Sequence, residues 1–118
     1  MLRTKQTQKA YMELLENVDP RLCPFCSERK ILSSFKFWYI TVNRFEYDAR
    51  CDISEILTTK RHVAKLSELT INEVKELFYI LETQMGKYQY QTLNSLDFRS
   101  ISGHLHFHLL VDKHIEIK

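Results

Sequence analysis

Three histidines at alternating positions near the end of the sequence are the residues best able to do chemistry. His104, His106 and His108 are separated by Leu105 and Phe107. On a β-strand this two-residue period points all three imidazoles to one face and the apolar side chains to the other. Neutral imidazole is a nucleophile and a proton carrier near pH 7, and it also binds metals. The pattern predicts a reactive or metal-binding face, and a surface strand that happens to carry histidine has the same spacing.

A Cys-Pro-Phe-Cys turn is the second candidate site. Cys23 and Cys26 have a spacing that both metal-binding pairs and redox pairs use, but thioredoxin-type pairs open a helix, and strand-like sequence follows here. Metal is therefore favoured. Structural zinc takes four ligands, so His62 and His104 are the candidates for the other two, giving a closed site. Cys51 has no partner by spacing and is predicted to be a small buried residue.

Hydrophobic periodicity predicts the elements that position these residues. Residues 4–17 carry apolar side chains at helical spacing, which predicts an N-terminal helix ending near Asp19. Residues 31–47 are rich in aromatic and β-branched side chains and predict two strands, with 53–58 as a further candidate. The alternation over residues 102–117 predicts strand structure around the histidines.

A long helix is predicted between these strands. Thr70 and Glu73 form a capping box, and the residues behind it recur every three or four positions to give one apolar face. That face, expected to be core, comprises Val74, Leu77, Phe78, Leu81 and Met85. Strands on both sides of a long helix predict an α+β fold, with an antiparallel sheet packed against it and the N-terminal helix in addition.

Composition is that of an ordinary globular domain. The 118 residues are 44% hydrophobic and 27% charged, and the net charge of +2 is too small to indicate a nucleic-acid or membrane partner. Neither a signal peptide nor a membrane span is recognised, and the cysteine usage favours the reducing cytoplasm. The basic N-terminal residues Arg3, Lys5 and Lys9 are expected to form a solvated helix face.

Together these motifs resemble the histidine triad (HIT) family. The residues 104–110, His-Leu-His-Phe-His-Leu-Leu, fit its signature of three histidines alternating with apolar residues. The cysteine pair is similar to the zinc pair of bacterial members, and Lys60-Arg61-His62 is similar to the family's Pro-Lys-x-His segment. The resemblance runs from about Cys23 to Asp112. It implies an N-terminal helical extension over 1–22 and a histidine triad domain over 23–118.

The resemblance also implies a mechanism and a ligand set. His106 would attack the α-phosphate of a nucleotide phosphoramidate or dinucleoside polyphosphate and form a covalent nucleotidyl-histidine, and His108, in its charged form, would stabilise the phosphate. His104 would join Cys23, Cys26 and His62 around a structural zinc ion. Family members are usually homodimers. Expected substrate contacts come from Asn94, Ser100, Ser102, Phe45 and Glu46.

This sequence departs from the family pattern at several positions. The segment Arg99–Gly103 replaces a Gly-Gln-Ser type run, so Ser100 or Ser102 is expected to take over its phosphate contacts. Thr59 stands where a proline is usual, and Ser54 stands where many members carry another histidine. Two alternatives to the enzyme follow. One is a non-catalytic zinc-stabilised scaffold that binds nucleotides or proteins, and the other is a plain metal-binding protein.

Overall fold

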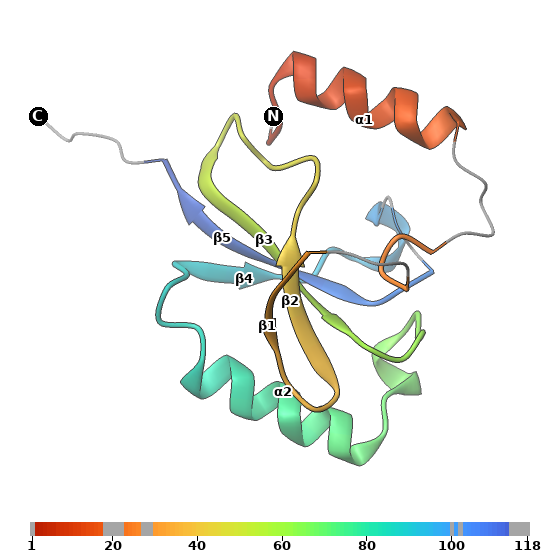
Figure 1. Ribbon diagram of the computed structural model, residues 1–118, viewed down its shortest axis with the longest axis vertical. Coiled ribbons are helices and arrows are strands. Elements are labelled where there is room, and N and C mark those ends of the chain that lie inside the picture. Colours follow the sequence, from red (N-terminus) through yellow and green to blue (C-terminus); the bar gives the residue numbers. More distant parts are fainter. Residues whose placement is uncertain (1, 18–22, 27–29, 100, 102, 114–118) are drawn as a thin grey trace, which may run out of the picture.

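The computed structural model describes residues 2–17, 23–26, 30–99, 101 and 103–113. It has an α+β fold, as predicted, built on one five-stranded antiparallel sheet with the strand order β1-β2-β3-β5-β4 (Figure 1). The strands are β1 (Ile31–Ser34), β2 (Trp38–Val42), β3 (Cys51–Thr59), β4 (Tyr90–Thr92) and β5 (His106–Asp112). The helices are α1 (Lys5–Asn17) and α2 (Ile71–Thr83), and short 3-10 turns occur at Leu66–Glu68 and Leu96–Phe98.

The histidine-bearing strand β5 lies inside the sheet, between β3 and β4. Its register places His106 opposite Thr58 and His108 opposite Ile56 on β3. The predicted strand over 53–58 is confirmed and is longer than expected, because β3 pairs with β5 over residues 51–58 and with β2 over residues 55–59. The three-residue strand β4 was not predicted, since so short a run has no measurable alternation.

The strand β5 begins two residues later than the triad does. His104 precedes it, and the backbone N–H of Leu105 donates to the carbonyl of Val63 at 2.7 Å rather than to a sheet neighbour. The prediction that the strand starts at residue 102 is therefore wrong. His104 is instead held beside the segment that follows β3. Residues 114–117 of the predicted strand region lie outside the described residues.

The main core fills the space between the sheet and α2. Leu105 and Leu109 are fully buried there with Leu57 and Ile80, while Phe107 packs at the edge, so the apolar face of the triad segment is confirmed. The predicted capping box forms: Thr70 Oγ1 accepts from Glu73 N, and Glu73 Oε1 accepts from Thr70 N. This core holds the triad segment rigidly from behind.

The predicted apolar face of α2 needs one correction. Phe78 is 62% exposed, whereas Ile80 is fully buried, and Val74 and Leu81 are half-buried. The side chains of a helix advance by 100° per residue, and the buried stripe here is centred on Leu77 and Ile80, which turns Phe78 toward solvent.

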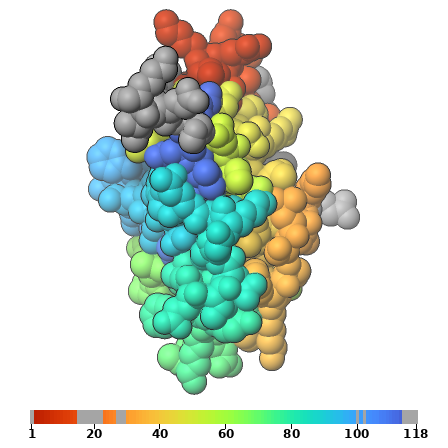
Figure 2. Space-filling model, turned by 90° about the vertical axis from the view of Figure 1, so that its left-hand side faces the viewer, coloured from red at the N-terminus to blue at the C-terminus, as the bar shows by residue number. Residues whose placement is uncertain are grey.

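The N-terminal segment lies across the sheet from α2 and forms one end of the molecule (Figures 1 and 2). It is tied to the loop between β2 and β3: the N–H of Ala49 donates to the carbonyl of Leu2 at 2.9 Å. Asp48 accepts hydrogen bonds from Thr4 N at 2.8 Å and from Thr7 Oγ1 at 2.6 Å. These bonds fix where the residues before α1 lie relative to the sheet.

The predicted solvated basic face is only partly correct. Lys5 and Lys9 are exposed on α1. Arg3 precedes the helix and is half-buried, with its guanidinium between two tyrosine rings. An arginine can leave a solvated face for such a position because its planar, weakly hydrated head stacks on aromatic rings.

Candidate active site and metal centre

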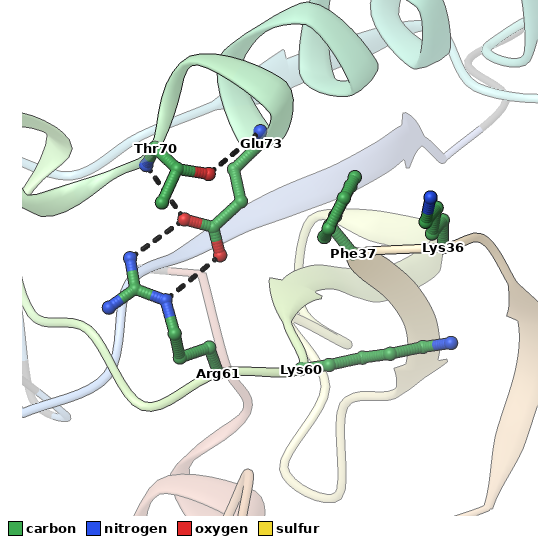
Figure 3. A pocket seen from close by; sticks show the side chains of 6 residues that line it. All are labelled: Lys36, Phe37, Lys60, Arg61, Thr70 and Glu73. Carbon is green, nitrogen blue, oxygen red and sulfur yellow. Dashed lines mark hydrogen bonds and ion pairs between the residues drawn. The ribbon is translucent and has the colours of Figure 1, made fainter.

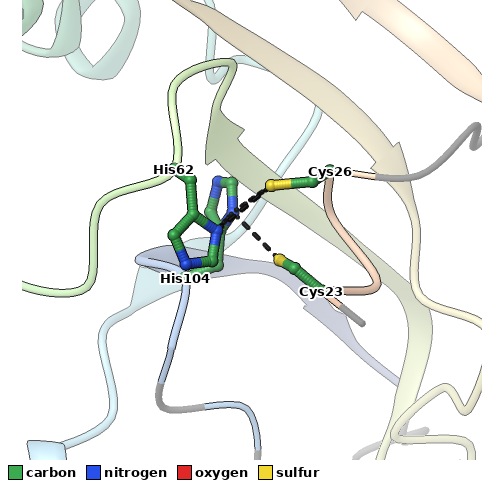
Figure 4. Close-up of side chains that lie close together, drawn as sticks. All are labelled: Cys23, Cys26, His62 and His104. Carbon is green, nitrogen blue, oxygen red and sulfur yellow. Dashed lines mark hydrogen bonds between the residues drawn. The ribbon is translucent and has the colours of Figure 1, made fainter. Parts of the chain in front are cut away.

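Four side chains predicted to bind zinc meet at one point, although they come from three distant segments (Figure 4). Cys23 Sγ lies 3.2 Å from His104 Nδ1, and Cys26 Sγ lies 3.1 Å from His62 Nδ1. The two imidazole nitrogens are 3.2 Å apart. A tetrahedral zinc ion at its usual bond lengths separates its ligand atoms by about 3.3–3.8 Å. The cluster fits such an ion with small adjustments.

Hydrogen bonds from neighbouring residues orient His104 for this role. Its Nε2 lies 2.8 Å from the carbonyl oxygen of Thr59, so Nε2 carries the proton and donates it there. The lone pair is then on Nδ1, the atom that faces the thiols. Metal-bound histidines are commonly held by such a second hydrogen bond. Thr59, which departs from the family pattern, therefore supports a ligand.

The two thiols would need a cation between them once they ionise. Partial desolvation raises the pKa of Cys26 to about 11, and the hydrogen bond and the charge of the neighbouring Cys23 thiol add to this effect. Two thiolates at this distance repel each other unless a positive ion lies between them. With four protein ligands the coordination is complete, which is the pattern of a structural site rather than a Lewis-acid centre.

His106 is buried next to this cluster, beneath the aromatic ring of Phe25. The two rings are 4.9 Å apart, and the Phe25 carbonyl accepts a hydrogen bond of 2.5 Å from the Tyr39 hydroxyl on β2. His106 Nδ1 lies 2.9 Å from the carbonyl oxygen of His104 and so donates its proton there. Consequently Nε2 carries the lone pair, as a nucleophilic imidazole requires.

His108 lies beyond His106, with ring centroids 5.2 Å apart. The exposed surface areas of His104, His106 and His108 are 0%, 6% and 4%, which excludes the exposed-strand interpretation. Burial, then the neighbouring His106 and the charge of Arg3, lower the pKa of His108 to about 3. In the free protein these causes favour the neutral form of His108, and the expected charged form concerns the complex with a phosphate.

Tyr47 is the main site residue that the sequence did not reveal. Its ring stacks on His108 at 4.7 Å, and its hydroxyl lies 3.0 Å from His108 Nε2. Asn94 also hydrogen-bonds this hydroxyl, although desolvation raises the Tyr47 pKa overall. If the Asn94 amide donates to the phenol oxygen, the phenol proton goes to His108 Nε2. The His108 proton is then on Nδ1, which has no partner among the described residues.

The other predicted substrate contacts have mixed outcomes. Asn94 hydrogen-bonds Tyr47, whose hydroxyl in turn lies beside His108 of the triad. Phe45 packs on Tyr11 of α1 with ring centroids 5.2 Å apart, and Glu46 is exposed on the same loop. Ser100 and Ser102 lie outside the described residues. No regular spacing in the sequence links Tyr47 or Phe25 to the triad, because both come from loops that the fold brings there.

A separate pocket lies at the start of α2 (Figure 3). It has a volume of about 210 Å³ and contains none of the triad or cysteine residues. Arg61 binds Glu73 across it at 2.7 Å, and this bond, ahead of other causes, lowers the Glu73 pKa. The pair closes the capping box of α2, so we assign it a structural role. The lining residues are Lys36, Phe37, Lys60, Arg61, Thr70 and Glu73.

Among the described residues, no helix combines the length and apolar character needed to cross a membrane. In sequence comparisons neither a family profile nor a curated protein matches the chain.

Solved structures nevertheless share its architecture. A HIT family hydrolase from Legionella pneumophila Philadelphia 1 is 15% identical with a TM-score of 0.58, covering 80% of this chain and 96% of that one. A HIT family hydrolase from Clostridium thermocellum is 18% identical with a TM-score of 0.59, covering 83% and 96%. A hypothetical protein from Leishmania major is 18% identical with a TM-score of 0.59, and the match covers 80% of this chain and 74% of that one. The chain therefore has the histidine triad fold.

Proposed function

We propose that this protein is a nucleotide hydrolase or nucleotidyl transferase that cleaves at the α-phosphate through a covalent nucleotidyl-histidine on His106. One observation carries the proposal: the bond from His106 Nδ1 to the carbonyl of His104 leaves the lone pair on Nε2. The histidine triad fold and the neighbouring His108 support it.

The reaction has two steps. His106 Nε2 attacks the α-phosphorus, and the bond from phosphorus to the leaving group breaks with its electron pair going to that group. The ring becomes positively charged, and the carbonyl of His104 stabilises this charge because it accepts the Nδ1 proton. Water or another acceptor then attacks phosphorus, loses its proton and displaces Nε2. Dividing the displacement in this way lowers each barrier.

The zinc ion belongs to the proposal as a structural cofactor held by Cys23, Cys26, His62 and His104. When bound, it supplies a rigid link and no reactive coordination position. His104 then connects the metal cluster to the nucleophile, because its side chain is a ligand and its carbonyl accepts from His106. This arrangement would fix the orientation of the His106 ring.

The test compares wild type with His106→Asn, using adenosine phosphoramidate and dinucleoside polyphosphates and measuring the AMP released. The expected loss of kcat is at least about a thousandfold, the scale seen when a covalent nucleophile is removed. Zinc content and AMP affinity should stay unchanged and serve as folding controls. Turnover retained by His106→Asn would contradict the role of His106.

A non-catalytic scaffold is the second candidate, and the burial of the triad favours it. Phe25 packs on His106 and Tyr47 packs on His108, and the two histidines are only 6% and 4% exposed, which restricts access to the triad. Wild-type protein that is zinc-loaded and binds AMP but releases none from any substrate would identify the scaffold.

We also propose a homodimer in the cytoplasm. The exposed Phe78 and Tyr79 on α2 are apolar surface that a second copy could cover. Light scattering at micromolar concentration should give twice the mass of the chain, and a monomer mass would contradict the homodimer.

A further inference from the structure

Arg3 is held against the triad side of the sheet by residues from two segments. Its guanidinium carbon lies 4.3 Å from the ring centre of Tyr11 and 4.8 Å from that of Tyr47. Its Nε donates to the carbonyl of Phe45 at 2.6 Å. The bonds of Leu2 and Thr4 to the loop between β2 and β3 fix the backbone on both sides. The position of this cation is therefore built into the fold.

Arg3 forms no ion pair with a carboxylate of the described residues. None of the ion pairs formed by the described residues includes Arg3; those pairs join Arg50 to Asp112, Arg61 to Glu73 and Lys87 to Glu55. Arg3 is half-buried, and its other polar contact is a long one of 3.4 Å to the uncharged Gln8. Aromatic stacking makes this position tolerable for an arginine, and a guanidinium held in this way can bind an anion such as a phosphate.

Arg3 is one aromatic ring away from the triad. The Tyr47 ring that contacts the guanidinium also stacks on His108 at 4.7 Å. The charge of Arg3 is one of the causes, after burial and His106, of the lowered pKa of His108, so its field reaches that ring. The Tyr47 ring therefore separates Arg3 from His108, and a phosphate that follows the α-phosphate at His106 would meet the guanidinium only after Tyr47 moves from His108.

We propose that Arg3 is a specificity-determining residue that binds the leaving-group phosphate, so that the site favours phosphoanhydride over phosphoramidate substrates. This inference rests on the function proposed above. When a phosphoanhydride bond breaks, the electron pair and a growing negative charge go to the departing phosphate, which a guanidinium stabilises in bidentate fashion. When a phosphoramidate bond breaks, the departing amine needs a proton instead, and an arginine does not give one up.

The triad itself supplies no such positive charge. His106 must be neutral to attack, and burial keeps His108 neutral. Lys5 and Lys9, the other cations of this segment, are exposed on α1. Among the cations of residues 2–17, Arg3 is therefore the one that contacts a ring stacked on the triad.

The experiment measures kcat/KM of wild type, Arg3→Gln and Arg3→Lys for a dinucleoside polyphosphate and for adenosine phosphoramidate. Arg3→Gln should lower the value for the polyphosphate about 100-fold and that for the phosphoramidate by less than about threefold, because only the former loses charge stabilisation. Arg3→Lys should recover part of the loss. Lys9→Gln, which removes an exposed charge from the same segment, should leave both values unchanged.

The outcomes separate this inference from the function on which it rests. Equal losses on both substrates would show that Arg3 only supports the fold, and unchanged values would show that it does not meet the leaving group; either result overturns the inference while the function stands. Wild-type protein without turnover on either substrate would instead contradict the function itself.

Discussion

His104 and His108 occupy the two ends of one triad, and both are buried, but their polar atoms have different surroundings. At the first end, His104 Nε2 donates to Thr59 and Nδ1 faces two thiols and His62. At the second end, the Tyr47 hydroxyl lies beside His108 Nε2. Within the described part of the chain, His108 Nδ1 has no partner and the nearby Arg3 pairs with no carboxylate. Both ring nitrogens of His104 have partners once a metal binds, whereas His108 Nδ1 has none among the described residues.

The difference indicates how the triad divides its work. A buried polar group without a partner costs stability, and such groups are retained mainly where a ligand or reaction uses them. The His104 end has the properties of a structural link, whereas the His108 end carries a buried nitrogen without a partner among the described residues. His106 lies between the two ends, and its Nδ1 is hydrogen-bonded to the carbonyl oxygen of His104.

Removing a metal ligand should lower the stability most, because it destroys the metal site at the His104 end. Cys26→Ser is expected to lose the metal and to lower the free energy of unfolding by about 4 kcal/mol or more, the range in which losses of metal sites fall. Metal analysis and urea denaturation measure both quantities. Cys51→Ser, which alters a buried cysteine outside the cluster, should keep the metal. Full metal content in Cys26→Ser would rule out this ligand set.

Acid should destabilise the protein because His108 takes up a proton more readily when the chain is unfolded. The pKa of His108 is about 3 in the folded state and about 6.5 when unfolded, so between these values the unfolded chain binds a proton that the folded chain does not. Stability is therefore fully present above pH 6.5 and falls below it, by about 1.4 kcal/mol per pH unit for this one group.

Urea midpoints of wild type and His108→Gln between pH 7 and pH 4.5 test this dependence. The variant should show a shallower slope, because it has no proton to bind at this position. Identical slopes would mean that His108 takes up its proton over the same pH range in the folded and unfolded protein, and would contradict the lowered pKa.

Tyr47→Phe should be the next largest effect, since it removes the hydroxyl that bonds His108 Nε2. Leaving a buried nitrogen without a partner costs about 1–3 kcal/mol. Tyr90→Phe is the matched control, because its hydroxyl bonds Asp112, which is partly exposed to water. In thermal denaturation Tyr47→Phe should unfold at a lower temperature than Tyr90→Phe. The reverse order would contradict the role given to the bond between Tyr47 and His108.

Thr59→Val should have the smallest effect. Thr59 Oγ1 lies 3.1 Å from His104 Nε2, but that nitrogen keeps its bond to the Thr59 carbonyl in the variant. The expected loss is about 1 kcal/mol, with metal content unchanged. Loss of the metal in Thr59→Val would show that the cluster depends on the hydroxyl more than on the backbone.

The two ends also differ in how far the sequence could predict them. The Cys23 pair and the alternating histidines have spacings with a physical meaning, so the metal cluster and the buried histidine face were predictable. Tyr47 and Arg3 have no such spacing, because loop and terminal segments reach the triad only through tertiary packing. Arg3 in particular was expected in solvent, since an isolated basic residue is usually exposed.

Within the elements, the capping box of α2 was predictable from two residues, whereas β4 was not. The first is a local interaction that the chain makes with itself. The second is a three-residue pairing that exists because Gln91 and its neighbours lie beside β5 in the folded molecule.

The most direct test is intact-protein mass spectrometry of the zinc-loaded chain mixed with adenosine phosphoramidate or a dinucleoside polyphosphate. Samples are quenched without acid, because a phosphorus–nitrogen bond is acid-labile, and are then fragmented to find the modified residue. The account predicts an adduct of one nucleoside monophosphate on His106, absent from His106→Asn. An adduct on another residue, or AMP release by His106→Asn at the wild-type rate, would contradict it.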